Sequence, residues 1–397
     1  MIKKGATKKQ KRNQKWVQEY FFLVVPLPKK DELLSSWLLR LAFAHERIMA
    51  TFISLFIKQD GSKISAIDID FRYYDELFDA IATKSQLDKQ QILQMSLRSE
   101  EGYLYHCNDC LYPTKQIRKL SDKRTHNGLL YCPKCLKEDE VPYWRKHWRY
   151  WFYNACTKHN VFLTDRCWVC NEPIKLYKMQ NSNGAVYCGK CGNDLRDTVS
   201  VRVSRRYDYG MEAIQWFENG LQNGYFMIGS EKVHSLWIFE SATRLQWLLD
   251  RKDNLVLDGF PLIDEYKQLS KKLDNYNSKK AKAVYKDFLL NAMVYFLFQD
   301  FPKNLFNFAR QNNLTYREFT HGFKEIPFWY KEMIGELVPI QNKIGREISE
   351  REVIGAINYL KSIGEQVTKV EVAKIVGCHY SIHKGFGRVY KRLKRNI

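Results

Sequence analysis

The chain has 397 residues and a net charge of +20, with 64 Lys and Arg against 44 Asp and Glu. That length can form two or three domains with buried cores, so a small disulfide-stabilised framework is excluded. No apolar run approaches the roughly 18 residues of a membrane span, and the basic N-terminus lacks a signal-like apolar segment. These features predict a cytoplasmic protein, where cysteines stay reduced and can bind zinc.

The positive charge is concentrated at the two ends of the chain. Residues 1–15 contain seven Lys and Arg and no acid, and residues 366–397 contain eight against Glu371, so together they supply +14 of the +20. Clustered cations attract phosphates with a salt-dependent affinity. Double-stranded DNA is therefore the expected partner, and residues 1–25 are expected to form a basic, disordered tail.

Apolar residues recur at helical spacing after the extended segment 26–28. They predict a helix over residues 33–42 with Asp31 as its N-cap. Further helices are expected over residues 48–57, 74–82 and 88–97. Residues 26–102 should thus form a small helical domain of helix-turn-helix character.

Nine of the ten cysteines lie between residues 107 and 191, in closely spaced pairs of which one ends in histidine. The pairs are Cys107/Cys110, Cys132/Cys135, Cys156/His159, Cys167/Cys170 and Cys188/Cys191, and Cys378 lies apart. Two residues between ligands let one tight turn direct both toward a single ion, and two such turns complete a tetrahedron. The pattern predicts a tandem structural zinc module over residues 103–198.

Spacing favours two complete sites in this module. The first comprises Cys132, Cys135, Cys156 and His159, and the second comprises Cys167, Cys170, Cys188 and Cys191. The alternative joins the Cys107 pair to the Cys132 pair and the Cys156 pair to the Cys167 pair, which leaves the Cys188 pair alone. In the favoured pairing, Cys107 and Cys110 either hold a third ion with His126 or His106 or remain reduced thiols.

The aromatic segment between the ligand pairs contains Trp144, Trp148 and Trp151. Their spacing predicts one face of a helix. The indoles either stack on bases or pack the core of the zinc module, and packing is favoured. Arg145, Lys146 and Arg149 are expected at the surface.

The remaining chain is expected to be helical. Residues 199–343 form an aromatic-rich helical domain in which 268–282 is an exposed loop. Residues 344–397 form a helix-turn-helix-like region, with one helix over 349–363, a second over 370–376 capped by Thr368, a turn at Gly377 and a recognition helix over 380–393. The predicted DNA contacts of this region are Lys384, Arg388, Lys391, Arg392, Lys394 and Arg395. The alternative is a packing role for this helix, with incidental basic residues.

Catalytic motifs are missing from the sequence. It contains no P-loop, no glycine-rich dinucleotide motif and no zinc-deaminase signature. Four protein ligands also close a zinc ion against substrate. A binding protein is therefore expected, with a zinc-braced nuclease as an alternative.

Two stretches resemble the TniQ/TnsD family of transposon target-selection proteins. One runs from Pro26-Leu27-Pro28 through Asp31-Glu32-Leu33-Leu34-Ser35-Ser36-Trp37, and the other from Tyr131-Cys132-Pro133-Lys134-Cys135 through Trp148-Arg149 to the Cys188 pair. The resemblance implies the two zinc sites favoured above. It also implies target-site marking and recruitment of a TnsC-like AAA+ ATPase.

The resemblance leaves two branches open. Residues 297–308 and the basic C-terminus resemble the DNA-reading TnsD branch, whereas the length of the chain resembles a shorter TniQ that docks on a CRISPR effector (Cascade-like) complex. A homodimer is a further expected assembly. The Cys107 pair has no counterpart in the family pattern.

The sequence therefore predicts a mainly α, multi-domain protein with small zinc-ribbon or finger β elements, containing two structural Zn2+ ions and optionally a third. Its predicted function is that of a non-enzymatic adaptor in DNA transposition. The alternative is a stand-alone sequence-specific transcription regulator.

Overall fold

The computed structural model describes the chain in segments. These are residues 21–57, 68–72, 75–107, 113–120, 127–180, 184–251, 255–272, 279–320, 328–337, 348–378 and 384–393, with 323 and 326. They divide into two compact units, Met1–Phe308 and Ala309–Ile397. Most of the predicted tail, residues 1–20, lies outside the described residues.

Helices dominate both units, as predicted. Within the described residues the strands form two antiparallel hairpins, β1 (Ala155–Cys156) with β2 (Val161–Phe162) and β3 (Tyr225–Ile228) with β4 (Glu231–His234). None of the described helices combines the length and apolarity needed to cross a bilayer.

The first unit begins with short helices around a buried α2. They are α2 (Leu34–Ala44), α3 (Met49–Phe52) continued by a π-helical turn (Ile53–Ile57), α4 (Asp75–Ser85) and α5 (Lys89–Met95). Trp37, Leu38 and Leu41 of α2 are fully buried, so this helix is the centre of the local core. The predicted cap was wrong: Leu33 occupies the N-cap of α2, and Asp31 has a φ of +59°.

The N-terminal helices pack directly on the cysteine-rich region. The Leu33 amide donates to the Trp144 carbonyl at 2.8 Å, and the Lys146 amide donates to the Asp31 carbonyl at 2.7 Å. Ser36 Oγ accepts from the Trp144 amide at 2.9 Å. Polar groups of the two regions therefore form hydrogen bonds with one another, and the two regions belong to one folded unit.

The tryptophan segment does not form the predicted α-helix. Lys146–Arg149 is a single 3-10 turn, and the backbone is extended at Arg145 and Tyr150 on either side of it. Trp144 and Trp148 are fully buried, and Trp151 is 7% exposed. The packing alternative is thus confirmed, with a different backbone.

The basic residues of this segment were wrongly predicted to lie at the surface. Arg149 is fully buried, and its guanidinium donates to Asp68 at 2.6 and 3.2 Å and to Asp70 at 3.3 Å. Lys146 is also buried, and its ammonium donates to the Gln94 carbonyl at 3.0 Å. Their charges are compensated by partners far away in the sequence, which periodicity does not reveal.

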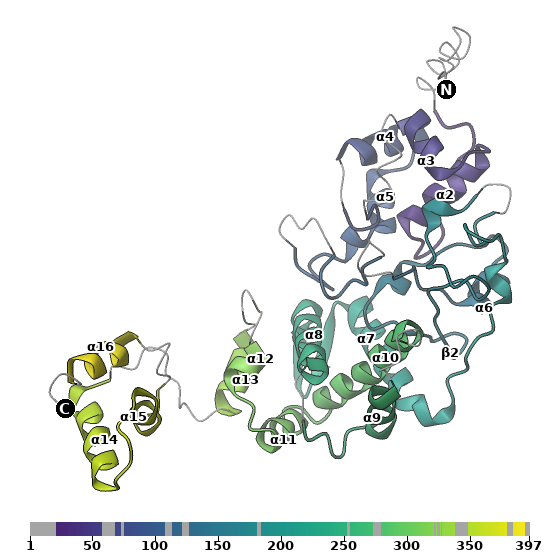
Figure 1. The fold of residues 1–397 in the computed structure, drawn as a ribbon. Helices are drawn as coiled ribbons and strands as arrows, with labels where there is room; N and C mark the ends of the chain where they lie inside the picture. The colour runs from purple at the N-terminus through teal and green to yellow at the C-terminus, as the bar shows by residue number, and fades with distance from the viewer. Residues whose placement is uncertain are drawn as a thin grey trace, which may run out of the picture. The chain divides into compact units, whose positions relative to one another are not determined.

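A helical layer completes the first unit. It contains α7 (Asp208–Asn223), α8 (Ser235–Arg251), α9 (Ile263–Lys272), α10 (Lys279–Phe298) and the start of α11 (Lys303–Gln311). In Figure 1, α7 and α8 lie against α10. Phe152 of the cysteine-rich region stacks on Phe217 of α7 and Phe239 of α8, which joins this layer to the rest of the unit.

Two features of this layer differ from the prediction. The 268–282 segment is helical over 268–272 and 279–282, and residues 273–278 lie outside the described residues. The β3–β4 hairpin was not predicted. It follows α7 directly because Gly224, with a φ of +75°, ends that helix.

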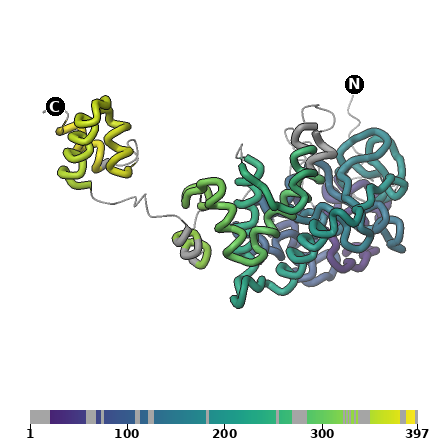
Figure 2. Tube along the Cα trace, turned by 90° about the horizontal axis from the view of Figure 1, so that it is seen from below, coloured from purple at the N-terminus to yellow at the C-terminus, as the bar shows by residue number. Residues whose placement is uncertain are grey.

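The second unit contains α12 (Tyr316–Thr320), α13 (Phe328–Leu337) and a C-terminal group of three helices. These are α14 (Glu350–Ser362), α15 (Lys369–Val376) and α16 (Lys384–Leu393). They share a core that includes Val353, Ile357, Val372, Ala373 and Phe386, and Figure 2 shows them as a compact cluster.

The caps of the C-terminal helices agree with the sequence. Ser349 forms a capping box with Glu352 at the start of α14, and Thr368 Oγ1 accepts from the Glu371 amide at the start of α15. Gly377 ends α15 in the left-handed conformation. The bounds of both helices therefore follow the prediction to within one residue.

Candidate metal centres and basic helix

The structure brings together the four residues of the first favoured site. His159 Nδ1 lies 3.4 Å from Cys132 Sγ, 3.3 Å from Cys135 Sγ and 3.4 Å from Cys156 Sγ. Cys135 Sγ and Cys156 Sγ are 3.7 Å apart. The three cysteines are buried, so the cluster is enclosed by protein.

The second favoured set also converges. Cys167 Sγ lies 3.5 Å from Cys191 Sγ, and Cys170 Sγ lies 3.6 Å from Cys188 Sγ. In each cluster the four ligand atoms all lie within 4.8 Å of one another. The alternative pairing, which joins the Cys156 pair to the Cys167 pair, does not occur in the structure.

Both clusters have the dimensions of a tetrahedral zinc site. Zn–S bonds of about 2.3 Å and Zn–N bonds of about 2.0 Å imply S···S and S···N separations of about 3.8 and 3.5 Å in a tetrahedron. The observed separations are 3.5–3.7 Å between sulfurs and 3.3–3.4 Å between sulfur and nitrogen. The clusters can each hold one metal ion, and the donor set suits zinc.

Three of the four ligand pairs share one local geometry. The amides of Asn160, Asn171 and Gly192 donate to the carbonyls of Cys156, Cys167 and Cys188, four residues earlier in each case. These three donors all have positive φ, between 50° and 73°. Asn and Gly adopt this conformation at low cost, so an Asn or Gly directly after each pair is a further sequence signal for this turn.

The fourth pair opens a helix instead. Cys132 is the N-cap of α6 (Pro133–Glu138), with Pro133 at the first helical position, and Cys135 lies in its first turn. Proline is tolerated there because that position needs no amide donor. A helical turn and a hairpin turn therefore supply the two halves of the first site.

The cysteine pKa values are shifted within both clusters. Hydrogen bonds from Cys132 and Cys135 hold the pKa of the Cys156 thiol well below its usual range. The side-chain amide of Asn193 lowers the pKa of Cys191 to about 6. One thiol in each cluster therefore favours the thiolate, and a metal ion would displace protons from the others on binding.

The predicted third site lies partly outside the described residues. Cys107 is buried and disulfide-bonded, and neither Cys110 nor His126 is described. A sulfur in a disulfide is not a thiolate ligand, so a third metal ion would require Cys107 in its reduced form. The third site stays a prediction.

The described part of α16 presents cations beside an apolar face. Phe386 and Tyr390 are buried in the three-helix core, whereas Arg388, Lys391 and Arg392 are exposed. Arg392 pairs with Glu350 of α14 at 2.6 Å. The side chain of Lys384 is not described, and Lys394 and Arg395 lie outside the described residues.

A comparison with protein families identifies the N-terminal half of the first unit. Residues 23–163 match the family model of TniQ. The chain carries a TniQ domain. The match covers α2 to α6, the tryptophan segment and the complete first cluster, and it ends before the second cluster begins. No curated protein matches the chain.

The TniQ domain connects this chain to DNA transposition, because its family consists of transposition-associated adaptor proteins that are generally non-catalytic. The resemblance in the sequence is thus confirmed at the level of the family. The buried tryptophans and the Arg149 ion pairs are parts of this domain, so they are architectural features of it.

Proposed function

We propose that this chain is a non-enzymatic target-site adaptor in DNA transposition, which binds double-stranded DNA and recruits a TnsC-like AAA+ ATPase of the transposon. The TniQ domain at residues 23–163 is the observation that carries this proposal. The two closed Cys/His clusters support it, because four-ligand zinc sites stabilise structure and offer no open position to a substrate.

We assign the DNA contact to α16. This helix follows α15 and the Gly377 turn, and it buries one face in the three-helix core while Arg388 and Lys391 remain exposed. In helix-turn-helix proteins, the exposed residues of the second helix reach phosphates and base edges. No described residue forms an ion pair with Arg388 or Lys391, so both charges are available to an anionic partner.

The experiment that tests this assignment compares two double variants. Arg388→Gln/Lys391→Gln removes two charges from α16, and Arg351→Gln/Lys361→Gln removes two exposed charges from α14. The first variant should weaken duplex binding about tenfold. It should also reduce the slope of log K against log salt concentration by about 2, since each lost phosphate contact reduces that slope by about 1. Zinc content should not change.

The control variant separates a local contact from a general effect of charge. Duplex affinity of the α14 variant should stay within about twofold of the unmodified chain, because its net charge changes equally without loss of a phosphate contact. Equal losses in both variants, or no loss in either, would remove α16 as the DNA contact.

The helix-turn-helix favours a second candidate, a stand-alone transcription regulator. Such a protein binds a defined operator and has no ATPase partner. Immobilised chain that retains the AAA+ ATPase encoded in the same transposon supports the adaptor. If target marking depends instead on a Cascade-like effector complex, DNA binding by the isolated chain should be independent of sequence.

A further inference from the structure

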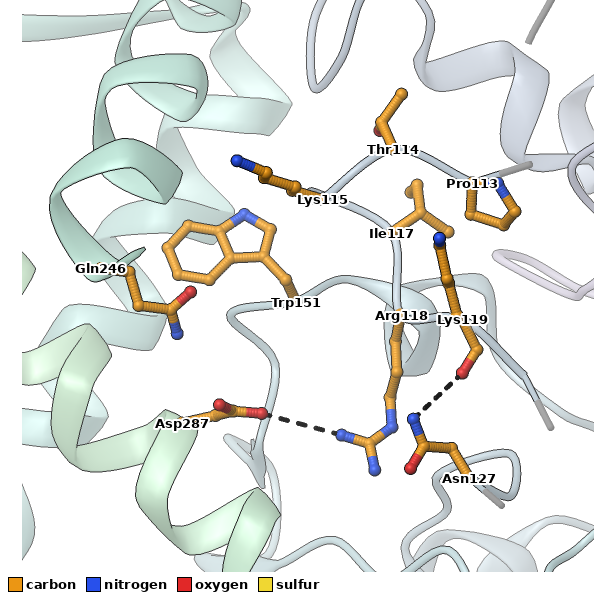
Figure 3. A pocket seen from close by; sticks show the side chains of 10 residues that line it. All are labelled: Pro113, Thr114, Lys115, Ile117, Arg118, Lys119, Asn127, Trp151, Gln246 and Asp287. Carbon is orange, nitrogen blue, oxygen red and sulfur yellow. Dashed lines mark hydrogen bonds and ion pairs between the residues drawn. The ribbon is translucent and has the colours of Figure 1, made fainter. Parts of the chain in front are cut away.

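A pocket of 410 Å³ lies in the first unit, within the size range of small-molecule sites. Its lining comes from the segment 113–119, from Trp151 and from side chains of α8 and α10 (Figure 3). Neither metal cluster contributes to it. The pocket therefore has no role in the function proposed so far.

Buried donors without partners line this pocket. Trp151 is 7% exposed, and its indole Nε1 is a buried donor. The Thr114 hydroxyl and Arg118 Nε are buried as well, and none of these three atoms has a hydrogen-bond partner among the described residues. Leaving such groups unsatisfied costs about 1–3 kcal/mol each, so a ligand that accepts hydrogen bonds would be favoured.

The charge of the pocket is positive. Lys115 and Lys119 line it without an ion pair to any residue in the described part of the chain. Among the described residues, the Arg118 guanidinium pairs with Asp165 at 3.5 Å and with Asp287 at 3.9 Å. Burial and the charge of Arg244 lower the pKa of Lys115, so a further cation lies near this lysine.

We propose that this pocket binds a phosphate group, through the ammonium groups of Lys115 and Lys119 and the N–H donors of Arg118 and Trp151. A phosphate offers three strong acceptor oxygens, which suits a pocket lined by several donors better than the two oxygens of a carboxylate. The phosphate belongs either to the backbone of a bound DNA duplex or to a free nucleotide. The site uses none of the residues of α16.

The test uses the full chain and two matched double variants. Lys115→Gln/Lys119→Gln removes the pocket cations, and Lys30→Gln/Lys303→Gln removes two exposed lysines elsewhere in the same unit. One arm measures anisotropy of a short fluorescent duplex over a range of salt. The other measures 31P line broadening of inorganic phosphate and of ATP, with acetate at equal ionic strength as the competitor control.

We expect the pocket variant to bind its phosphate about tenfold more weakly and the control variant to bind it as the unmodified chain does. A loss of duplex affinity, with a salt dependence reduced by about 1 to 2, identifies the backbone as the source. A loss of 31P broadening alone identifies a free phosphate. Unchanged binding in both arms, or equal losses in the control variant, overturns the proposal, and neither outcome depends on α16.

Discussion

Glu138 forms an ion-pair contact with the one histidine in the metal clusters. Its Oε1 lies 2.8 Å from His159 Nε2, while Nδ1 of the same ring lies within 3.4 Å of all three sulfurs. A carboxylate on the outer nitrogen selects the tautomer in which the inner nitrogen is a free ligand. Glu138 also pairs with Lys158 at 2.8 Å, which limits its own rotation.

Glu138→Gln should therefore weaken zinc binding about tenfold. This is the low end of the effect of losing a residue that contacts a metal ligand, because the Glu138 carboxylate is half exposed. Zinc transfer to a chromogenic chelator measures the change. Glu140→Gln is the matched control, since Glu140 is exposed two residues after the end of α6 and should leave affinity unaltered. Indistinguishable zinc release from the two variants would contradict a role for Glu138.

Arg149 is a fully buried charge in the TniQ domain. Its guanidinium has no exposed side-chain surface and contacts both Asp68 and Asp70. Burial raises the pKa of Asp70 to about 6 in spite of this cation, so the carboxylate is expensive to desolvate. Ser35 also stabilises the buried Asp70 carboxylate. Its amide and its hydroxyl donate to Asp70 at 2.7 and 2.8 Å.

Removal of one partner should leave an uncompensated buried charge. Arg149→Met is expected to lower the free energy of unfolding by about 3–5 kcal/mol. Chemical denaturation measures this loss, and exposed Arg205→Met should change stability by under about 0.5 kcal/mol. A loss below about 1 kcal/mol for Arg149→Met would show that the ion pairs are dispensable.

The metal ligands and Arg149 show what the sequence could and could not predict. Ligand pairs were predictable because two residues of spacing define a local turn. Arg149 was misplaced because its partners lie about 80 positions earlier, and its burial depends on a tertiary contact that periodicity cannot reveal.

At the scale of elements, Gly377 ends α15 and begins the turn toward α16. It has a φ of +72°, and a Cβ there would meet no atom within 4 Å. Any cost of Gly377→Ala is therefore conformational, and we expect about 1 kcal/mol of destabilisation. Thermal unfolding of the second unit, followed by its helical signal, measures it.

Gly355 provides the opposite case in the same group of helices. It lies inside α14, also with open space around its Cα, but without a positive φ. Gly355→Ala should stabilise the helix by about 0.5–1 kcal/mol. Two substitutions of the same kind should thus have opposite signs. Changes of the same sign would contradict this account of the turn.

Helix bounds were predictable where caps and apolar spacing agreed. Ser349, Thr368 and Gly377 each mark a helix end in the sequence, and the structure has α14 and α15 there. The tryptophan segment satisfied a helical spacing without forming an α-helix. The backbone of residues 144–146 pairs instead with residues 31–36, which satisfies its polar groups while Trp144 and Trp148 are buried.

At the scale of the whole molecule, the first unit joins the TniQ domain to a second cluster and a helical layer, and the second unit supplies the basic three-helix group. The sequence predicted the two Cys/His clusters and the mainly helical content. It did not predict that the N-terminal helices and the cysteine-rich region share one core, since hydrogen bonds such as that from Leu33 to Trp144 span more than 100 positions.

An adaptor must hold DNA and the AAA+ ATPase at the same time. The most direct measurement is retention of the ATPase of the same transposon on an immobilised duplex. The unmodified chain should retain it, and Arg388→Gln/Lys391→Gln should retain about tenfold less at equal chain concentration, although this variant still binds the ATPase in solution. Equal retention of the ATPase in three samples would contradict the adaptor function. These are the duplex with the unmodified chain, the duplex with the variant and the duplex alone.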